Sequence, residues 1–102
     1  MSKEIQNFRK KFDNLDTQIL NLLNKRNQLS KEIGEYKNKN NLSVQDKKRE
    51  KQILATIQEK AEKNNLDKKY IKQIFKAVLR SSRKIQKDKK WQIMYHSMIG
   101  KS

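Results

Sequence analysis

The chain has 102 residues, 33% of them hydrophobic, with neither proline nor cysteine and a formal net charge of +15. A chain this short and polar buries only a thin core by itself and has no disulfides to compensate, so we expect one domain that oligomerises. One histidine and no cysteine argue against a metal site of the structural zinc type. Because the chain has no apolar run of 18 residues and its first 11 residues are charged, we expect a cytoplasmic protein without a membrane span.

A long amphipathic helix is predicted over residues 3–39. Its apolar residues recur at alternating steps of three and four, with one gap: Ile5, Phe8, Phe12, Leu15, Ile19, Leu22, Leu29, Ile33 and Tyr36. This heptad spacing keeps one stripe of a helix facing a partner helix. A helix of roughly 35 residues is about 50 Å long, whereas a compact monomer of this size is roughly 26 Å across. We therefore expect the helix to pair with a second copy of the chain.

Arg26 occupies the gap in this apolar stripe. An arginine on a packed seam is costly unless a negative group meets it. The stripe alone leaves two interpretations open. Arg26 either binds an anion, or it lies at the edge of the stripe, where it extends into solvent or pairs with a local carboxylate.

A polar connection is expected over residues 38–43, and a second helix begins near Asp46, whose side chain is a good N-cap. The apolar stripe of this helix follows Arg49 by one turn and comprises Ile53, Ile57 and Ala61, with Leu54 beside it. Glu50 lies next to Arg49 in the first turn, where a charged pair is also common without any function. Two asparagines at 64–65 end the helix.

A third helix begins at Asp67, with Leu66 and Ile71 at the positions of a hydrophobic staple. Its apolar stripe comprises Ile71, Ile74, Phe75, Val78 and Leu79. Ser82 and Gln86 then continue the same face at one-turn spacing. Either the helix leaves the core at this point, or these polar groups face a site.

Residues 1–90 are therefore predicted to form one all-α domain of three helices, one long and two shorter. Residues 91–102 break the pattern, because they are apolar after a basic run. They either extend the third helix and dock on the dimer, or form a C-terminal tail.

Polar residues on otherwise apolar faces form one constellation: Arg26, Lys37, Arg49, Glu50, Ser82 and Gln86. Arg26 and Lys37 lie about 20° apart around their helix and roughly 16 Å apart along it, so a small polyanion between them could touch both. Arg9 lies about 25 Å from Arg26 along the same helix. If it contributes to such a site, it contributes to the site of another protomer.

The chain resembles the all-helical class of chorismate mutases, without a gap from about Phe8 to Gln86. The residues that carry the resemblance are Arg9, Leu15, Asp16, Ile19, Leu20, Leu22, Leu23, Lys25, Arg26, Ile33, Gly34, Lys37, Val44, Asp46, Arg49, Glu50, Leu66, Tyr70, Ile71, Phe75, Ser82 and Gln86. Single pieces of this set are weak, but the ordered set at these spacings is highly specific. The resemblance implies an intertwined homodimer with two equivalent sites, each built largely by one chain plus one arginine from the other.

In that family chorismate is rearranged to prephenate, a step toward phenylalanine and tyrosine, with no metal or cofactor. The resemblance implies that Arg9 from the partner and Arg26 bind the two substrate carboxylates. It implies that Lys37 and Gln86 donate to the ether oxygen. The resemblance also implies that Glu50, with help near Asp46, binds the ring hydroxyl. Arg49 and Ser82 would complete the polar wall of the pocket.

Other functions stay open from the sequence. The chain could be the homologous isochorismate-pyruvate lyase, which uses the same fold and a similar site. It could also be the allosteric domain of a fused aromatic-pathway enzyme. The charge could also indicate a basic module that binds nucleic acid. However, 21 of the 26 basic residues are Lys, spread around all faces, and Asn is abundant, as an AT-rich genome would produce. The arginines are more informative, because a chain that prefers Lys keeps Arg where the planar guanidinium matters. There are five: Arg9, Arg26, Arg49, Arg80 and Arg83.

Overall fold

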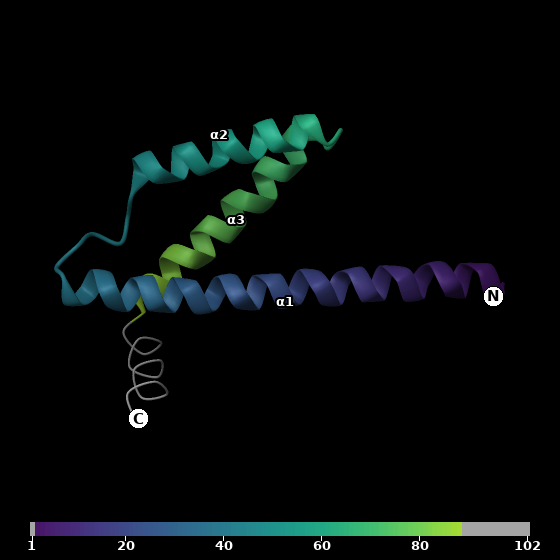
Figure 1. The fold of residues 1–102 in the computed structure, drawn as a ribbon, viewed down its shortest axis with the longest axis horizontal. Coiled ribbons are helices and arrows are strands. Elements are labelled where there is room, and N and C mark those ends of the chain that lie inside the picture. Colours follow the sequence, from purple (N-terminus) through teal and green to yellow (C-terminus); the bar gives the residue numbers. More distant parts are fainter. Residues whose placement is uncertain (1, 89–102) are drawn as a thin grey trace, which may run out of the picture.

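The computed structural model describes residues 2–88, which form three α-helices joined by two short connections (Figure 1). Helix α1 spans Lys3–Lys39, α2 spans Lys47–Lys63 and α3 spans Lys68–Lys87. The predicted all-α class, with one long and two shorter helices, is confirmed. The segment expected as a tail, residues 91–102, lies outside the described residues.

Each helix begins at a side chain that accepts a hydrogen bond from a backbone N–H of the first turn. Asp46 Oδ1 accepts from the N–H of Arg49 at 3.0 Å, and Asp67 Oδ1 accepts from the N–H of Lys69 at 2.9 Å. Ser2 caps α1 in the same way. Such caps satisfy N–H groups that have no partner within the helix. The two predicted aspartate caps are confirmed.

Helix α1 ends at an asparagine in the left-handed conformation. Asn41 has a φ of 55°, and the N–H of Leu42 donates back to the carbonyl of Lys37 at 2.8 Å. Asparagine tolerates this conformation better than other non-glycine residues, so the turn stops the helix. The connection to α2 therefore covers residues 40–46, rather than the predicted 38–43.

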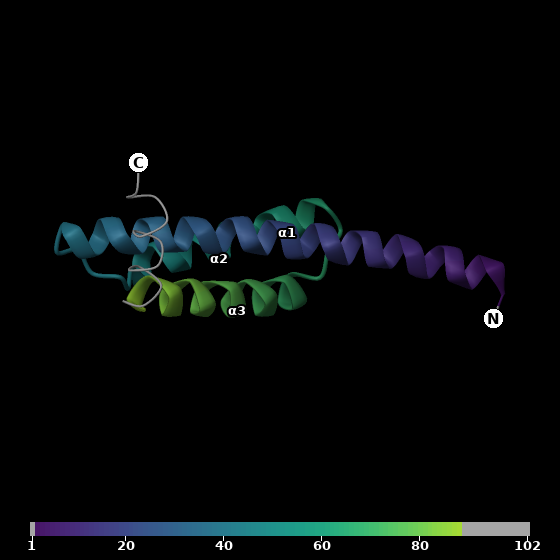
Figure 2. The same ribbon diagram turned by 90° about the horizontal axis from the view of Figure 1, so that it is seen from below.

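Helix α3 lies between the other two helices and packs on both. Figure 1 shows α3 crossing diagonally from the C-terminal end of α2 to the C-terminal half of α1, and Figure 2 shows it beneath them from a second side. Where α3 crosses α1, the hydroxyl oxygens of Ser30 and Ser82 are 2.6 Å apart, and Gly34 is buried one turn farther along α1. Small residues at the crossing let the two backbones approach closely. Within residues 2–88, no Cα atom of α1 lies within 8 Å of a Cα atom of α2.

The single chain has little core. Among the apolar side chains of residues 2–88, Ala61 and Leu79 are the buried ones, and every residue from 2 to 25 is exposed. Figure 1 shows the N-terminal part of α1 projecting beyond α2 and α3. The exposed apolar stripe of α1 is defined by Ile5, Phe8, Phe12, Leu15, Ile19, Leu22, Leu29, Ile33 and Tyr36. None of the helices in the described part of the chain is long and apolar enough to cross a membrane.

Candidate active site

A cavity of about 470 Å³ lies among the three helices, next to the connection between α1 and α2. This is within the usual size range of small-molecule sites. Its apolar walls come from residues of all three helices and the connection: Leu29, Ile33, Val44, Ile53 and Leu79. Its polar walls are formed by Arg26, Ser30, Lys37, Asp46, Arg49, Glu50, Ser82, Arg83 and Gln86.

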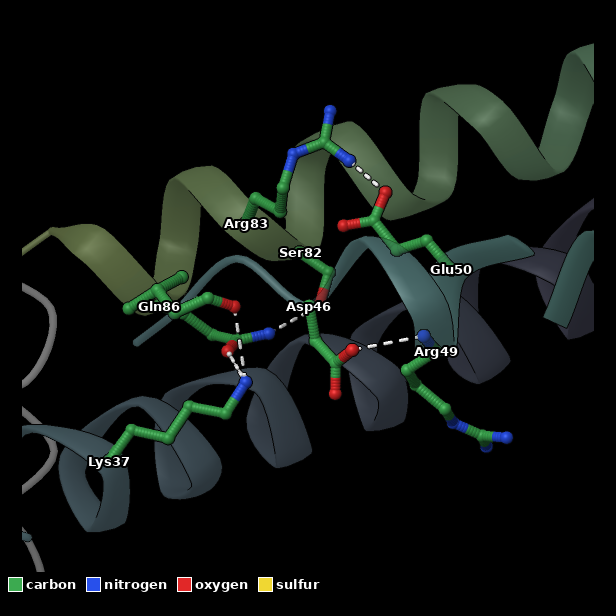
Figure 3. A network of polar contacts seen from close by, with 8 residues as sticks. Lys37, Asp46, Arg49, Glu50, Ser82, Arg83 and Gln86 are labelled. Atoms are coloured by element: carbon green, nitrogen blue, oxygen red, sulfur yellow. Dashed lines mark hydrogen bonds and ion pairs between the residues drawn. The ribbon is translucent and has the colours of Figure 1, made fainter. Parts of the chain in front are cut away.

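Lys37 lies at the centre of the polar contacts in this cavity. Its ammonium donates to the carbonyl of Val44 at 3.1 Å and to Oε1 of Gln86 at 3.0 Å. Figure 3 shows Lys37 pointing from α1 toward Gln86 on α3. Because α1 stops two residues after Lys37, the chain turns back and brings the carbonyl of Val44 within reach. The turn that ends α1 therefore also places a hydrogen-bond acceptor for Lys37.

Three side chains and one backbone carbonyl continue this contact as a directed chain of hydrogen bonds. Gln86 Nε2 donates to Ser82 Oγ at 3.2 Å, Ser82 and Ser30 are in contact, and Ser30 Oγ donates to the carbonyl of Arg26 at 3.1 Å. Since a carbonyl only accepts, Ser30 donates its hydroxyl proton to the carbonyl of Arg26 and accepts a hydrogen bond from Ser82. Lys37 only donates, so the amide oxygen of Gln86 faces Lys37 and the amide nitrogen faces Ser82. The direction of every bond in the chain follows.

The acidic side of the cavity is formed by Asp46 and Glu50 at the start of α2. The carboxylate of Asp46 caps the helix, whereas that of Glu50 pairs with the guanidinium of Arg83 from α3. Arg49 is exposed and donates to Gln52 at 2.9 Å, and Figure 3 shows its side chain directed away from Lys37. Arg49 therefore lines the edge of the cavity rather than its centre.

The cavity carries an excess of positive charge. Four cationic side chains line it, namely Arg26, Lys37, Arg49 and Arg83, against the two carboxylates. The excess of two positive charges suits a small ligand with two negative groups. Within residues 2–88, no group of three or more His, Cys, Asp and Glu side chains is placed to hold a metal ion.

Seven of the eight residues predicted for the site line this single cavity. They come from three segments that are distant in the sequence: Arg26, Lys37, Asp46, Arg49, Glu50, Ser82 and Gln86. Arg9 does not line it. It is exposed on the projecting part of α1, so the cavity of its own chain is out of its reach.

Two polar residues of the cavity were not predicted for the site. Ser30 is only 3% exposed and completes the hydrogen-bond chain, and Arg83 pairs with Glu50. A signal existed for each of them. Ser30 follows Arg26 by one helical turn and precedes Lys37 by two, on the same face. Arg83 is one of only five arginines in a chain that otherwise uses Lys.

Comparison with known proteins gives a consistent result. The family model of chorismate mutase type II matches residues 8–87. A chorismate mutase of Methanocaldococcus jannaschii is 36% identical over 67 residues, which are 66% of this chain and 68% of that protein. A solved structure from Pyrococcus furiosus, described as a conserved hypothetical protein, has a TM-score of 0.67 and 30% identity, and covers 85% of this chain and 100% of its own.

Longer proteins also contain a similar segment. A bifunctional chorismate mutase/prephenate dehydratase of Aquifex aeolicus is 44% identical over 55 residues, and one of Buchnera aphidicola is 39% identical over 64 residues. The chain matches 15% and 17% of the length of these two proteins. The match of the family model over most of the chain shows that it belongs to the type II chorismate mutase family and is, with that family, an isomerase.

Proposed function

We propose that the chain rearranges chorismate to prephenate in the cavity between its helices. The observation that carries the proposal is the contact of Lys37 with Gln86 in a cavity that has an excess of two positive charges. Chorismate carries two carboxylates and an ether oxygen, so it needs two cationic clamps and at least one donor between them. In the rearrangement the ether C–O bond breaks and a C–C bond forms, and no atom is gained or lost.

Arg26 binds one substrate carboxylate from within the same chain. Arg26 lines the cavity, and a guanidinium can form two parallel hydrogen bonds to a carboxylate. Clamping the substrate by its carboxylates holds the flexible enolpyruvyl arm over the ring, which removes much of the entropic part of the barrier. Arg49 and Ser82 complete the polar wall around the substrate.

Lys37 and Gln86 donate to the ether oxygen as the C–O bond breaks. Negative charge grows on that oxygen, so donors fixed beside it stabilise the transition state more than the ground state. Lys37 has three N–H donors, and the carbonyl of Val44 and the amide of Gln86 use two of them. Substrate binding gives the third a partner. Glu50, with Asp46 nearby, accepts a hydrogen bond from the ring hydroxyl.

The functional unit is an intertwined homodimer. Support comes from the stripe on α1, where Phe8 is 57%, Phe12 63% and Leu22 64% exposed. A continuous stripe of exposed apolar side chains marks an interaction surface. The heptad spacing of the stripe fits a second copy of the same helix. Helix α1 has 37 residues, and its N-terminal part extends past the other two helices (Figure 1).

Arg9 then completes the site of the partner subunit and binds the second substrate carboxylate. Its position on the projecting part of α1 supports this assignment, since that part extends beyond its own cavity. Each dimer would hold two equivalent sites, and each site would use the arginines of both chains.

The loss of chorismate absorbance on addition of purified protein tests the proposed activity. We expect turnover with prephenate as the product, and near-complete loss of turnover in the Arg26→Ala variant. Isochorismate supplied in parallel separates this activity from that of an isochorismate-pyruvate lyase, which would release pyruvate. Chorismate decay at the uncatalysed rate would contradict the proposal.

A further inference from the structure

The ion pair between Glu50 and Arg83 joins the start of α2 to the end of α3 at the wall of the cavity. Nη1 of Arg83 donates to Oε1 of Glu50, across 33 positions of the sequence. Figure 3 shows the two side chains directed toward one another from their separate helices. Both residues line the cavity, so the pair is part of the site and also a link between helices.

The pair is more sheltered than an ordinary surface pair. The side chains of Arg83 and Glu50 are 29% and 22% exposed, whereas those of Lys68 and Glu62 in a second ion pair are 49% and 66% exposed. Exposed pairs hold their side chains weakly, because water screens the charges and chain entropy opposes a single geometry. The partial shelter at Glu50 favours one fixed geometry of its carboxylate.

We propose that Arg83 is a positioning residue, which holds Glu50 to receive the ring hydroxyl of the substrate. This inference rests on the proposed function. A carboxylate has two oxygens and about four acceptor sites. A guanidinium bound to Oε1 sets the plane of the group and leaves acceptor sites on both oxygens for a hydroxyl. The ordering of the glutamate side chain is then complete before the substrate binds.

Arg83 also offsets a charge that would otherwise oppose binding. A lone carboxylate in this wall would repel a substrate with two negative charges, and its desolvation on binding would have no compensation. The guanidinium makes the local charge of the pair neutral, while the carboxylate of Glu50 keeps acceptor sites for a hydrogen bond. The pair thus recognises a hydroxyl at one place on the ring, and it distinguishes ligands by where that hydroxyl stands.

A double-mutant cycle tests the inference, with kcat and KM measured for wild type, Arg83→Gln, Glu50→Gln and the double variant. Arg83→Gln should lower kcat/KM for chorismate by roughly 5- to 100-fold. In the Glu50→Gln background the same change should have an effect within about 2-fold, because the residue it acts through has lost its charge. Arg83→Lys, which keeps the charge but not the planar fork, should recover part of the loss.

The specific readout is a chorismate analogue that lacks the ring hydroxyl. Arg83→Gln should leave kcat/KM for this analogue within about 2-fold of wild type, a result that a purely structural role would not produce. Arg80→Gln is the matched control, since Arg80 is an exposed arginine of α3 and its loss removes the same charge. It should match wild type on both substrates.

The possible failures are distinguishable. If Arg83→Gln reduces turnover equally in both backgrounds, or equally with both substrates, Arg83 does not act through Glu50 and the inference is overturned. If Arg83→Gln does not fold, the Arg83→Lys and Glu50→Gln variants form the same cycle and the same criteria apply. If wild type does not turn over chorismate, the proposed function itself fails. Wild-type activity with Arg83→Gln matching Arg80→Gln overturns only the inference.

Discussion

The amide oxygen of Gln86 and the ammonium of Lys37 lie 3.0 Å apart, and together they join α3 to α1 at the wall of the cavity. Gln86 is only 9% exposed, so its amide has a defined environment. A buried amide held in this way donates at any pH. A carboxyl group in its place would donate only when protonated, which gives a direct test of the proposed role.

Gln86→Glu should be poor at neutral pH and recover as the pH falls. An unperturbed glutamic acid has a pKa of about 4.3; burial raises the pKa of the introduced group, and the nearby ammonium of Lys37 lowers it. Above that pKa the carboxylate faces the developing negative charge, so the loss should lie mainly in kcat. The measurement is kcat from about pH 4.5 to 8, with folding checked at each pH.

Gln86→Ala provides the control for this profile. It removes the donor altogether, so kcat should fall by roughly 100- to 1,000-fold at every pH. Wild type should stay flatter than Gln86→Glu across the same range. A Gln86→Glu profile parallel to wild type would mean that this side chain does not face the breaking bond.

Mixing two inactive variants should restore activity. Arg9→Ala and Arg26→Ala should each nearly abolish turnover, since each removes a carboxylate clamp from every site. Random exchange makes about half of the dimers mixed, and each mixed dimer has one site with both arginines and one with neither. The mixture should therefore reach about a quarter of wild-type activity.

Subunit exchange must be verified before the mixture is assayed, for example with a size tag on one variant. The unmixed variants, incubated in the same way, are the control. No recovery after verified exchange would place Arg9 in the same site as Arg26, or in no site.

The apolar stripe of α1 should be required for assembly. We expect wild type to sediment as a dimer at micromolar concentration. Leu15→Asp introduces a charge on the stripe and should lower the dimer fraction, because a buried carboxylate without a partner is costly. Asn14→Asp adds the same charge at the neighbouring position off the stripe and should leave the dimer intact. A folded wild-type monomer would contradict the proposed assembly.

Ser30 should contribute to stability and to the orientation of Gln86. Ser30→Ala removes the acceptor that Ser82 uses, which should cost about 1 to 2 kcal/mol in the free energy of unfolding. Ser81→Ala, an exposed serine of α3, should change it by less than about 0.5 kcal/mol. Urea unfolding at equal protein concentration checks both values. Equal midpoints for the two variants would show that the Ser30–Ser82 contact is not significant in solution.

The sequence by itself determined the helices of this protein and most of the polar residues that line its cavity. The heptad stripe of α1, the aspartate caps at 46 and 67 and the asparagines that end α2 are local signals, since each depends on residues within a few positions. The polar residues that interrupt apolar faces could be found in the same way. Six of them, together with Asp46, line one cavity in the structure.

Only the tertiary structure decided which of these residues meet. Ser30 reads as an ordinary polar residue of a polar helix until α3 crosses α1 and places Ser82 against it. Arg83 is one of only five arginines in the sequence, but its pairing with Glu50 is decided by the packing of α3 on α2. Helical periodicity predicts which face of a helix a side chain occupies. Contacts between helices depend instead on the angle and distance at which the helices cross, and the sizes of the side chains at the crossing set both. For that reason most of the polar residues of the cavity could be predicted from the sequence, and their hydrogen-bond partners could not.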